Sequence, residues 1–94
     1  MTHQIIIRPA ADDDLDAARA WYEEKQRGLG NEFLANIGET LEKIRQRPDF
    51  GILVHKRMRR ANVRRFPYGV FYIVETHRVV VVGVLHGRRA PRQW

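Results

Sequence analysis

The strongest constraint on the fold is a pair of apolar segments separated by a short polar turn. Residues 70–75 and 79–86 are rich in β-branched and aromatic side chains, and Thr76 and His77 lie between them. Segments of this composition joined by a tight turn predict an antiparallel β-hairpin. Their nearly continuous apolar content indicates central strands that are covered on both faces. We expect helices over one face and a partner molecule over the other.

Two amphipathic helices joined by a short turn are predicted in the N-terminal half. The acidic run at residues 12–14 predicts the start of the first helix, because aspartate caps free backbone N–H groups and suits the positive end of the helix dipole. This helix is expected to continue to about Gln26. Asn31 is expected to cap the second helix and Pro48 to end it. Apolar residues recur at helical spacing in both segments, which predicts a helical hairpin with a shared apolar seam: Ala11, Leu15, Ala18 and Tyr22, then Phe33, Ile37, Leu41 and Ile44.

Shorter strands are predicted on either side of the helical hairpin. Residues 4–8 are typical of a strand that a proline ends, residues 49–55 are expected to be a connecting loop, and a period of two begins at Met58. Residues 66–69 contain a proline and predict a bend or bulge before the apolar hairpin. The expected fold is a single α+β domain over residues 1–94, with the element order β-α-α-β-β-β. In it the helical hairpin packs on a small, twisted, mostly antiparallel sheet.

The positive charge is concentrated in the second half of the chain. Residues 1–47 contain seven Lys/Arg and nine Asp/Glu, a balance of −2, whereas residues 48–94 contain ten Lys/Arg and two Asp/Glu, a balance of +8. Such asymmetry is typical of a surface that binds nucleic acid, an acidic protein or an anionic membrane. No apolar run approaches the length of a membrane span, and no cysteine is present, which fits a reducing compartment. We therefore expect a cytoplasmic protein without membrane contact.

Several classes of chemistry are excluded or disfavoured by the residues present. The chain contains no cysteine and no serine, so thiolate chemistry and a serine nucleophile are excluded. No glycine-rich phosphate-binding motif occurs, and no two of the four histidines are spaced to share a helical face. The basic half contains only two carboxylates, which disfavours paired acid–base catalysis. We expect no cofactor and no metal.

The residue types left for function are arginine, histidine, tyrosine and tryptophan. His86, at the end of the last strand, is either a proton carrier near neutral pH or a polar residue that closes the strand. Tyr68, Tyr72 and Trp94 can stack on bases, although Tyr72 inside a strand is typical of a core and Trp94 also fits a plug over the sheet. Arginines are permanent cations that grip phosphates or carboxylates through two parallel hydrogen bonds, and the candidates are Arg64, Arg65, Arg88, Arg89 and Arg92.

Two stretches of the C-terminal half resemble a known family. Residues 64–72 (Arg-Arg-Phe-Pro-Tyr-Gly-Val-Phe-Tyr) and 86–94 (His-Gly-Arg-Arg-Ala-Pro-Arg-Gln-Trp), with the predicted order of elements, resemble the RelE/ParE superfamily of bacterial type II toxins. The resemblance covers nearly the whole chain. It implies a small basic toxin encoded beside an antitoxin, which wraps around the toxin and neutralises it in a hetero-oligomer. RelE-like members enter the ribosome and cut messenger RNA, whereas ParE-like members inhibit DNA gyrase.

The resemblance favours the ParE-like branch. RelE-like members carry an arginine directly after the aromatic residue that opens the third strand, where this chain has Gly69 after Tyr68. Arg88 matches the arginine past the last strand of the family, and Trp94 stands where the family often has tyrosine. The resemblance therefore implies a toxin that inhibits gyrase by binding, without breaking a bond. The target-binding residues expected on this basis are Tyr68, Arg88, Arg89, Arg92 and Trp94.

Two alternative functions remain open at this point. A ribosome-dependent mRNA endonuclease would use Arg64 or Arg65, His86 and Arg88, and the ribosome would supply part of its site. A basic nucleic-acid-binding module needs only the cationic half and some aromatic side chains that stack on bases.

Overall fold

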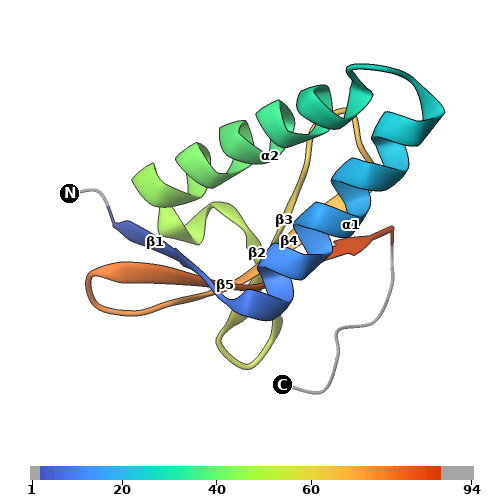
Figure 1. Ribbon diagram of the computed structural model, residues 1–94. Coiled ribbons are helices and arrows are strands. Elements are labelled where there is room, and N and C mark those ends of the chain that lie inside the picture. Colours follow the sequence, from blue (N-terminus) through green and yellow to red (C-terminus); the bar gives the residue numbers. More distant parts are fainter. Residues whose placement is uncertain (1–2, 88–94) are drawn as a thin grey trace.

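The computed structural model describes residues 3–87 and confirms the α+β fold (Figure 1). One five-stranded sheet has the strand order β1-β5-β4-β3-β2, in which β1 runs parallel to β5 and the other neighbours are antiparallel. The elements in chain order are β1 (Gln4–Ile7), α1 (Pro9–Lys25), α2 (Leu29–Gln46), the 3-10 helix η1 (Pro48–Phe50), β2 (Ile52–His55), β3 (Met58–Asn62), β4 (Tyr68–Val74) and β5 (Arg78–His86).

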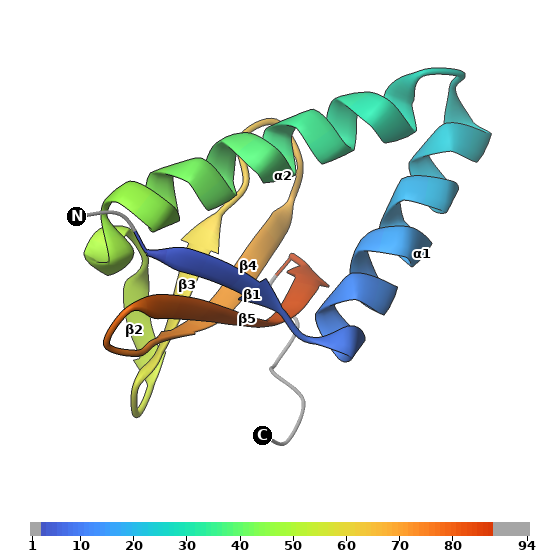
Figure 2. The same ribbon diagram turned by 60° about the vertical axis from the view of Figure 1, so that its left-hand side comes forward.

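Both helices lie over the same face of the sheet, and the main core lies between the two layers (Figure 2). The predicted helical stripes are confirmed: the seven residues other than Leu41 are buried, and Leu41 packs partly buried against them. Tyr72 of β4 has no exposed surface, so this tyrosine belongs to the core. Burying large side chains such as Phe33 and Tyr72 contributes roughly 1.5–3 kcal/mol each to the hydrophobic driving force.

The sheet also carries a second apolar cluster on the face away from the helices. Met58, Phe71, Val80, Val82 and Leu85 form this cluster, and each is at least 95% buried. Alternate residues of β4 and β5 therefore enter different cores, which is why both strands are apolar almost throughout. The prediction that both faces of the central strands are covered is confirmed. The cover by a partner molecule stays a prediction.

The predicted helix starts are wrong at both helices. Helix α1 begins at Pro9, three residues before the acidic run, because the proline occupies the first turn, where no backbone N–H is required. Helix α2 begins at Leu29 after Gly28, whose φ of 88° is left-handed. The Glu23 carboxylate accepts hydrogen bonds from the N–H groups of Gly28 and Gly30, both at 3.0 Å. Asn31 consequently lies inside the helix.

The segment at residues 49–55, predicted to be a loop, contains part of η1 and the whole of strand β2. Ile52 pairs with Arg60 and Leu53 with Arg59 of β3, and the register shifts between Leu53 and His55. Three consecutive apolar residues do not alternate, so the period of two that identifies a half-buried strand is missing. The sheet thus gains a strand that local pattern does not reveal.

The hairpin and the bend before it are confirmed. Strands β4 and β5 are joined through residues 75–77, and the Glu75 N–H donates to the Arg78 carbonyl at 2.8 Å. Residues 64–67 bend, and Arg65 has a left-handed φ of 74°. A register shift between Phe71 and Tyr72 marks a bulge in the β4–β5 pair. Neither helix of residues 3–87 is both long and apolar enough to cross a membrane.

Candidate functional site

The candidate site lies where β4 begins and β5 ends. Tyr68 and His86 are register partners there, and their rings meet edge to face with centroids 5.2 Å apart. Tyr68 is half-buried and His86 is exposed. The structure therefore brings together two of the residues proposed from sequence. The Gly87 N–H donates to the Pro67 carbonyl, which ties the residue after β5 to the bend before β4.

A buried aromatic cluster fixes the position of Tyr68. The Tyr68 ring lies 5.1 Å from Phe33 and 6.1 Å from Tyr22, and Phe66 lies within 5.3 Å of both of these rings. Edge-to-face aromatic pairs of this kind each contribute about 0.5–1.5 kcal/mol beyond the area that they bury. Burial, and then the neighbouring Tyr68, raise the pKa of Tyr22. The Tyr22 hydroxyl therefore stays protonated at neutral pH.

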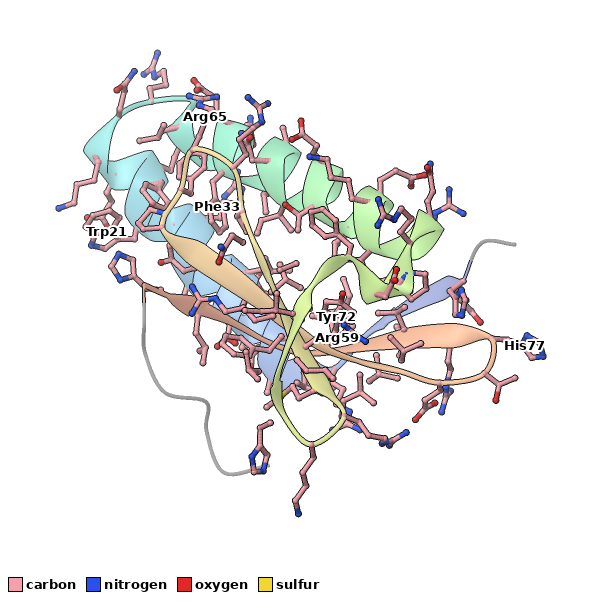
Figure 3. The ribbon with its side chains drawn as sticks, turned by 180° about the vertical axis from the view of Figure 1, so that it is seen from behind. Trp21, Phe33, Arg59, Arg65, Tyr72 and His77 are labelled. Carbon is pink, nitrogen blue, oxygen red and sulfur yellow. The ribbon has the colours of Figure 1, made fainter. Side chains whose placement is uncertain are left out.

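A pocket of about 350 Å³ opens beside Tyr68 and His86, between α1 and the end of β5. The Asp14 carboxylate accepts a hydrogen bond of 2.9 Å from the Val84 N–H. Trp21 is 54% exposed at the rim (Figure 3), and the Lys25 ammonium lies 4.7 Å from its ring centroid. Among the residues that the structure describes, the lining contains no Lys or Arg: Asp14, Ala17, Ala18, Trp21, Tyr68, Val84, Leu85 and His86.

An arginine that sequence reasoning missed lies over Gly69. Arg60 Nη2 donates to the Gly87 carbonyl at 2.6 Å, and its Nε donates to Asn62 at 3.2 Å. The guanidinium lies 5.4 Å from the Phe71 ring centroid. A Cβ atom at Gly69 would overlap Arg60 Nε. The space above Gly69 is thus filled by a cation from the neighbouring strand, and the signal for it was the placement of Arg60 and Asn62 on one face of β3.

Arg64 and Arg65 are engaged with α2. Arg64 binds Glu39 through two hydrogen bonds of 2.9 and 3.1 Å, and Arg65 binds Glu32 at 2.9 Å. The hydrogen bond from Arg64 is the main cause that lowers the pKa of Glu39. Figure 3 shows Arg65 beside α2. The structure therefore does not bring these two arginines to His86 as partners; their charges are compensated within the chain.

The remaining proposed residues are Arg88, Arg89, Arg92 and Trp94, which lie outside the described residues. Within residues 3–87, no group of three or more His, Asp or Glu side chains could hold a metal ion. The described site thus consists of an aromatic and histidine pocket on the helical side of the sheet and the guanidinium of Arg60 on the other side. Arg60 binds the carbonyl of Gly87, the residue that follows His86 of the pocket.

Comparisons with known proteins agree with this architecture. Residues 5–91 match the family described as ParE toxin of type II toxin-antitoxin system, parDE. A solved structure described as a chromosomal ParDE TA system from P. aeruginosa is similar, with a TM-score of 0.77 and 16% identity, covering 93% of this chain and 98% of that one. No curated protein matches. Because the family match spans nearly the whole chain, this protein belongs to the ParE toxin family and is a type II toxin.

Proposed function

We propose that this toxin binds DNA gyrase and inhibits it without breaking a bond itself, and that a cognate antitoxin neutralises it. Membership of the ParE family supports the proposal, as does the similarity to a structure described as a ParDE system. The toxin acts by occupying a surface of the enzyme. Its own contribution is therefore a rigid, cationic and aromatic contact face.

The observation that carries the proposal is the composition of the pocket beside His86. The described lining has one carboxylate, Asp14, and no Lys or Arg. A site that cleaves a phosphodiester stabilises the negative charge that develops on the phosphate, typically with cations or preorganised N–H donors. A carboxylate there repels the phosphate instead. Arg64 and Arg65 form ion pairs with glutamates of α2, so these two cations also do not serve a phosphate at this pocket.

The proposed contact face combines the residues inferred from sequence with the one found in the structure. Tyr68 is held rigid by the aromatic cluster, and Arg60 projects from the opposite side of the sheet onto Gly87. Arg88, Arg89, Arg92 and Trp94 follow directly in the chain and are proposed to extend the same face. Arginine and aromatic side chains are the residue types that dominate binding energy at protein interfaces.

Two assays with the purified toxin test the proposal. The toxin is added to a supercoiling reaction with gyrase and, separately, to translating ribosomes. We expect loss of supercoiling and intact message. Arg88→Ala should raise the toxin concentration for half-inhibition by about tenfold or more without changing the circular dichroism spectrum. Message cleavage with normal supercoiling would overturn the proposal. An unfolded Arg88→Ala variant would show that Arg88 has a structural role.

The antitoxin is expected to be encoded in the adjacent reading frame. Co-expression with that frame should restore growth and yield a complex that purifies together. The partner is expected to be acidic or amphipathic, because the second half of the toxin carries a balance of +8.

A further inference from the structure

Strand β2 is an edge strand whose apolar side chains are exposed to solvent. In the described part of the chain, β2 pairs with β3 on one side and has no strand on the other. Ile52, Leu53 and Val54 are 69%, 58% and 41% exposed. Proteins usually protect such an edge with charges or proline, because its unpaired backbone groups recruit another strand. Three consecutive exposed apolar residues at an edge indicate a place where another chain binds.

The charges of the β2–β3 hairpin are positive, although Arg57 also acts on Glu75, whose carboxyl pKa is lowered mainly by Arg78 and also by Arg57. The β2–β3 hairpin, residues 52–62, contains four Lys/Arg and no Asp/Glu. Arg59 and Arg60 donate to the backbone carbonyls of Gly51 and Gly87, at 2.7 and 2.6 Å. Within residues 3–87 none of the four forms a salt bridge, whereas Arg64, Arg65 and Arg78 each do. The nearest carboxylate in sequence is Asp49 of η1. An incoming segment that carries carboxylates is therefore attracted to this edge.

The edge also offers space for the side chains of an added strand. A pocket of about 200 Å³ is lined by Phe50, Gly51 and Ile52 of the η1–β2 segment and by the end of β3 from Arg60. Ile52 and Leu53 face opposite sides of the sheet, opposite Arg60 and Arg59 respectively. Arg59 donates to the Gly51 carbonyl directly before β2, so its guanidinium lies on the side of an added strand, whereas Arg60 points away from this edge toward Gly87.

A second pocket lies at the turn end of the same hairpin. Its volume is about 270 Å³, its floor is apolar, with Met58, Ile73 and Val82, and its rim is basic, with Lys56 and Arg57 among the lining residues. A segment that follows β2 toward the turn would place its next side chains near this pocket. An apolar floor with a cationic rim fits an apolar side chain flanked by Asp or Glu.

We propose that β2 is the docking strand for an extended segment of the cognate antitoxin, in which apolar residues are interspersed with Asp and Glu. The segment adds to the five-stranded sheet as a sixth strand along β2. Main-chain hydrogen bonds supply affinity in this mode, and the pockets for alternate side chains supply specificity. The inference rests on the proposed neutralisation by an antitoxin and names the surface on which it occurs.

A second copy of the toxin is a poorer occupant of the same edge. Two β2 strands paired about a twofold axis would bring eight Lys/Arg of the two hairpins together with no carboxylate between them. Like charges placed opposite one another across an interface suppress association. An acidic partner would instead place carboxylates near these cations and reduce their mutual repulsion.

The test compares charge insertion at the two edges of the sheet. The protein encoded by the adjacent reading frame is titrated against the toxin, its Leu53→Glu variant and its Ile7→Glu variant. Ile7 is the matched control, because it lies on β1 at the opposite edge and is also exposed, at 37%. Leu53→Glu should raise the Kd about tenfold or more, because it removes an apolar contact and repels the acidic segment, and Ile7→Glu should leave it unchanged. Circular dichroism establishes that both variants are folded. Amide exchange at residues 52–55 should slow in the wild-type complex.

The outcomes separate this inference from the function on which it rests. If the wild-type toxin binds the neighbouring protein, but Leu53→Glu binds equally well and residues 52–55 gain no protection, the docking strand is wrong while neutralisation stands. Weakening by Ile7→Glu alone would move the contact to β1. If the wild-type toxin does not bind, both proposals are overturned. A toxin dimer in sedimentation that protects residues 52–55 from amide exchange without the neighbouring protein would assign the edge to a second copy.

Discussion

Gly69 and Arg60 together determine where a cation lies on the sheet face away from the helices. By resemblance, the mRNA-cleaving relatives carry an arginine directly after the aromatic residue that opens this strand, and this chain has glycine there. The structure shows that the guanidinium of Arg60 occupies the space above Gly69 and binds the Gly87 carbonyl. A glycine at position 69 therefore leaves the space that the Arg60 side chain of the neighbouring strand occupies. The cation comes from β3 and points toward the end of β5.

At this scale, Gly69→Ala is expected to displace Arg60 while preserving the fold. The new Cβ atom would lie 2.7 Å from Arg60 Cζ and 3.0 Å from Cδ, so the flexible arginine must move and lose its bond to Gly87. The free energy of unfolding should fall by about 1 kcal/mol, measured by urea denaturation. In an Arg60→Ala background the same substitution should be neutral or slightly stabilising, because a strand interior prefers alanine to glycine. Equal costs in both backgrounds would show that the two residues are not coupled.

Among the elements, the connection from α2 to β2 depends on a single hydroxyl of β4. Tyr72 Oη accepts a hydrogen bond of 2.7 Å from the Gly51 N–H and donates one of 2.8 Å to the Pro48 carbonyl. Figure 3 shows Tyr72 behind this connection, close to Arg59. Burial is the main cause that raises the pKa of Tyr72, so the hydroxyl remains a donor at physiological pH. The position of the edge strand β2 thus depends on a residue of the central strands.

Tyr72→Phe is expected to loosen η1 and the start of β2. The substitution leaves the buried N–H of Gly51 without its acceptor, and an unsatisfied buried donor costs about 1–3 kcal/mol. Thermal unfolding should show a lower Tm, and amide exchange should accelerate first at residues 48–53. Tyr22→Phe is the matched control, since Tyr22 is also a buried tyrosine and lies in the main core away from η1. If both variants lose the same stability, the two hydrogen bonds of Tyr72 contribute nothing specific.

For the whole molecule, the acidic residues stabilise the fold of a basic chain. The carboxyl pKa values of Glu23, Glu39, Glu42 and Glu75 are all lowered from their ordinary value of 4.5. Backbone N–H groups of Gly28 and Gly30 are the main cause at Glu23, and hydrogen bonds from arginines at the other three. A carboxyl group whose pKa is lower in the folded protein than in the unfolded chain stabilises the fold at pH values above its pKa in the unfolded chain. This stabilisation is lost as the pH falls through its pKa in the folded protein. The toxin should therefore lose stability below about pH 4.5.

Glu23→Gln tests this expectation at the turn between the helices. At pH 7 the variant should unfold at lower urea, because the charge that holds the Gly28 and Gly30 N–H groups is gone. The difference from wild type should shrink as the pH falls through the lowered pKa of the Glu23 carboxyl, because the wild-type group then becomes protonated. Glu24→Gln, at an exposed neighbouring glutamate, should show no such convergence. A difference that stays constant with pH would mean that the charge of Glu23 is not involved.

How much of the structure could be predicted from sequence depended on how far apart in the chain the interacting residues lie. The helical stripes, the apolar hairpin and the bend before β4 depend on neighbours a few residues away, and their prediction was correct. The edge strand β2 was missed because its exposed apolar residues do not alternate. The helix starts were misplaced because Pro9, which has no N–H to satisfy, begins α1 ahead of the aspartates. At α2 the Glu23 carboxylate binds the N–H groups that Asn31 was expected to cap. Pairing of Tyr68 with His86 followed only once the register of β4 and β5 was known.

The sequence by itself determined the layers of this protein, a helical hairpin packed on a mostly antiparallel sheet. Periodicity and composition are local properties, and burying the apolar faces that they define leaves few arrangements. Only the tertiary structure decided which charges are compensated and which surfaces stay open. Arg64 meets Glu39 across 25 residues of chain and Arg65 meets Glu32 across 33, whereas β2 is left at the edge of the sheet with three apolar side chains exposed. Those outcomes depend on how the layers pack, because packing sets the distances over which hydrogen bonds and charges act.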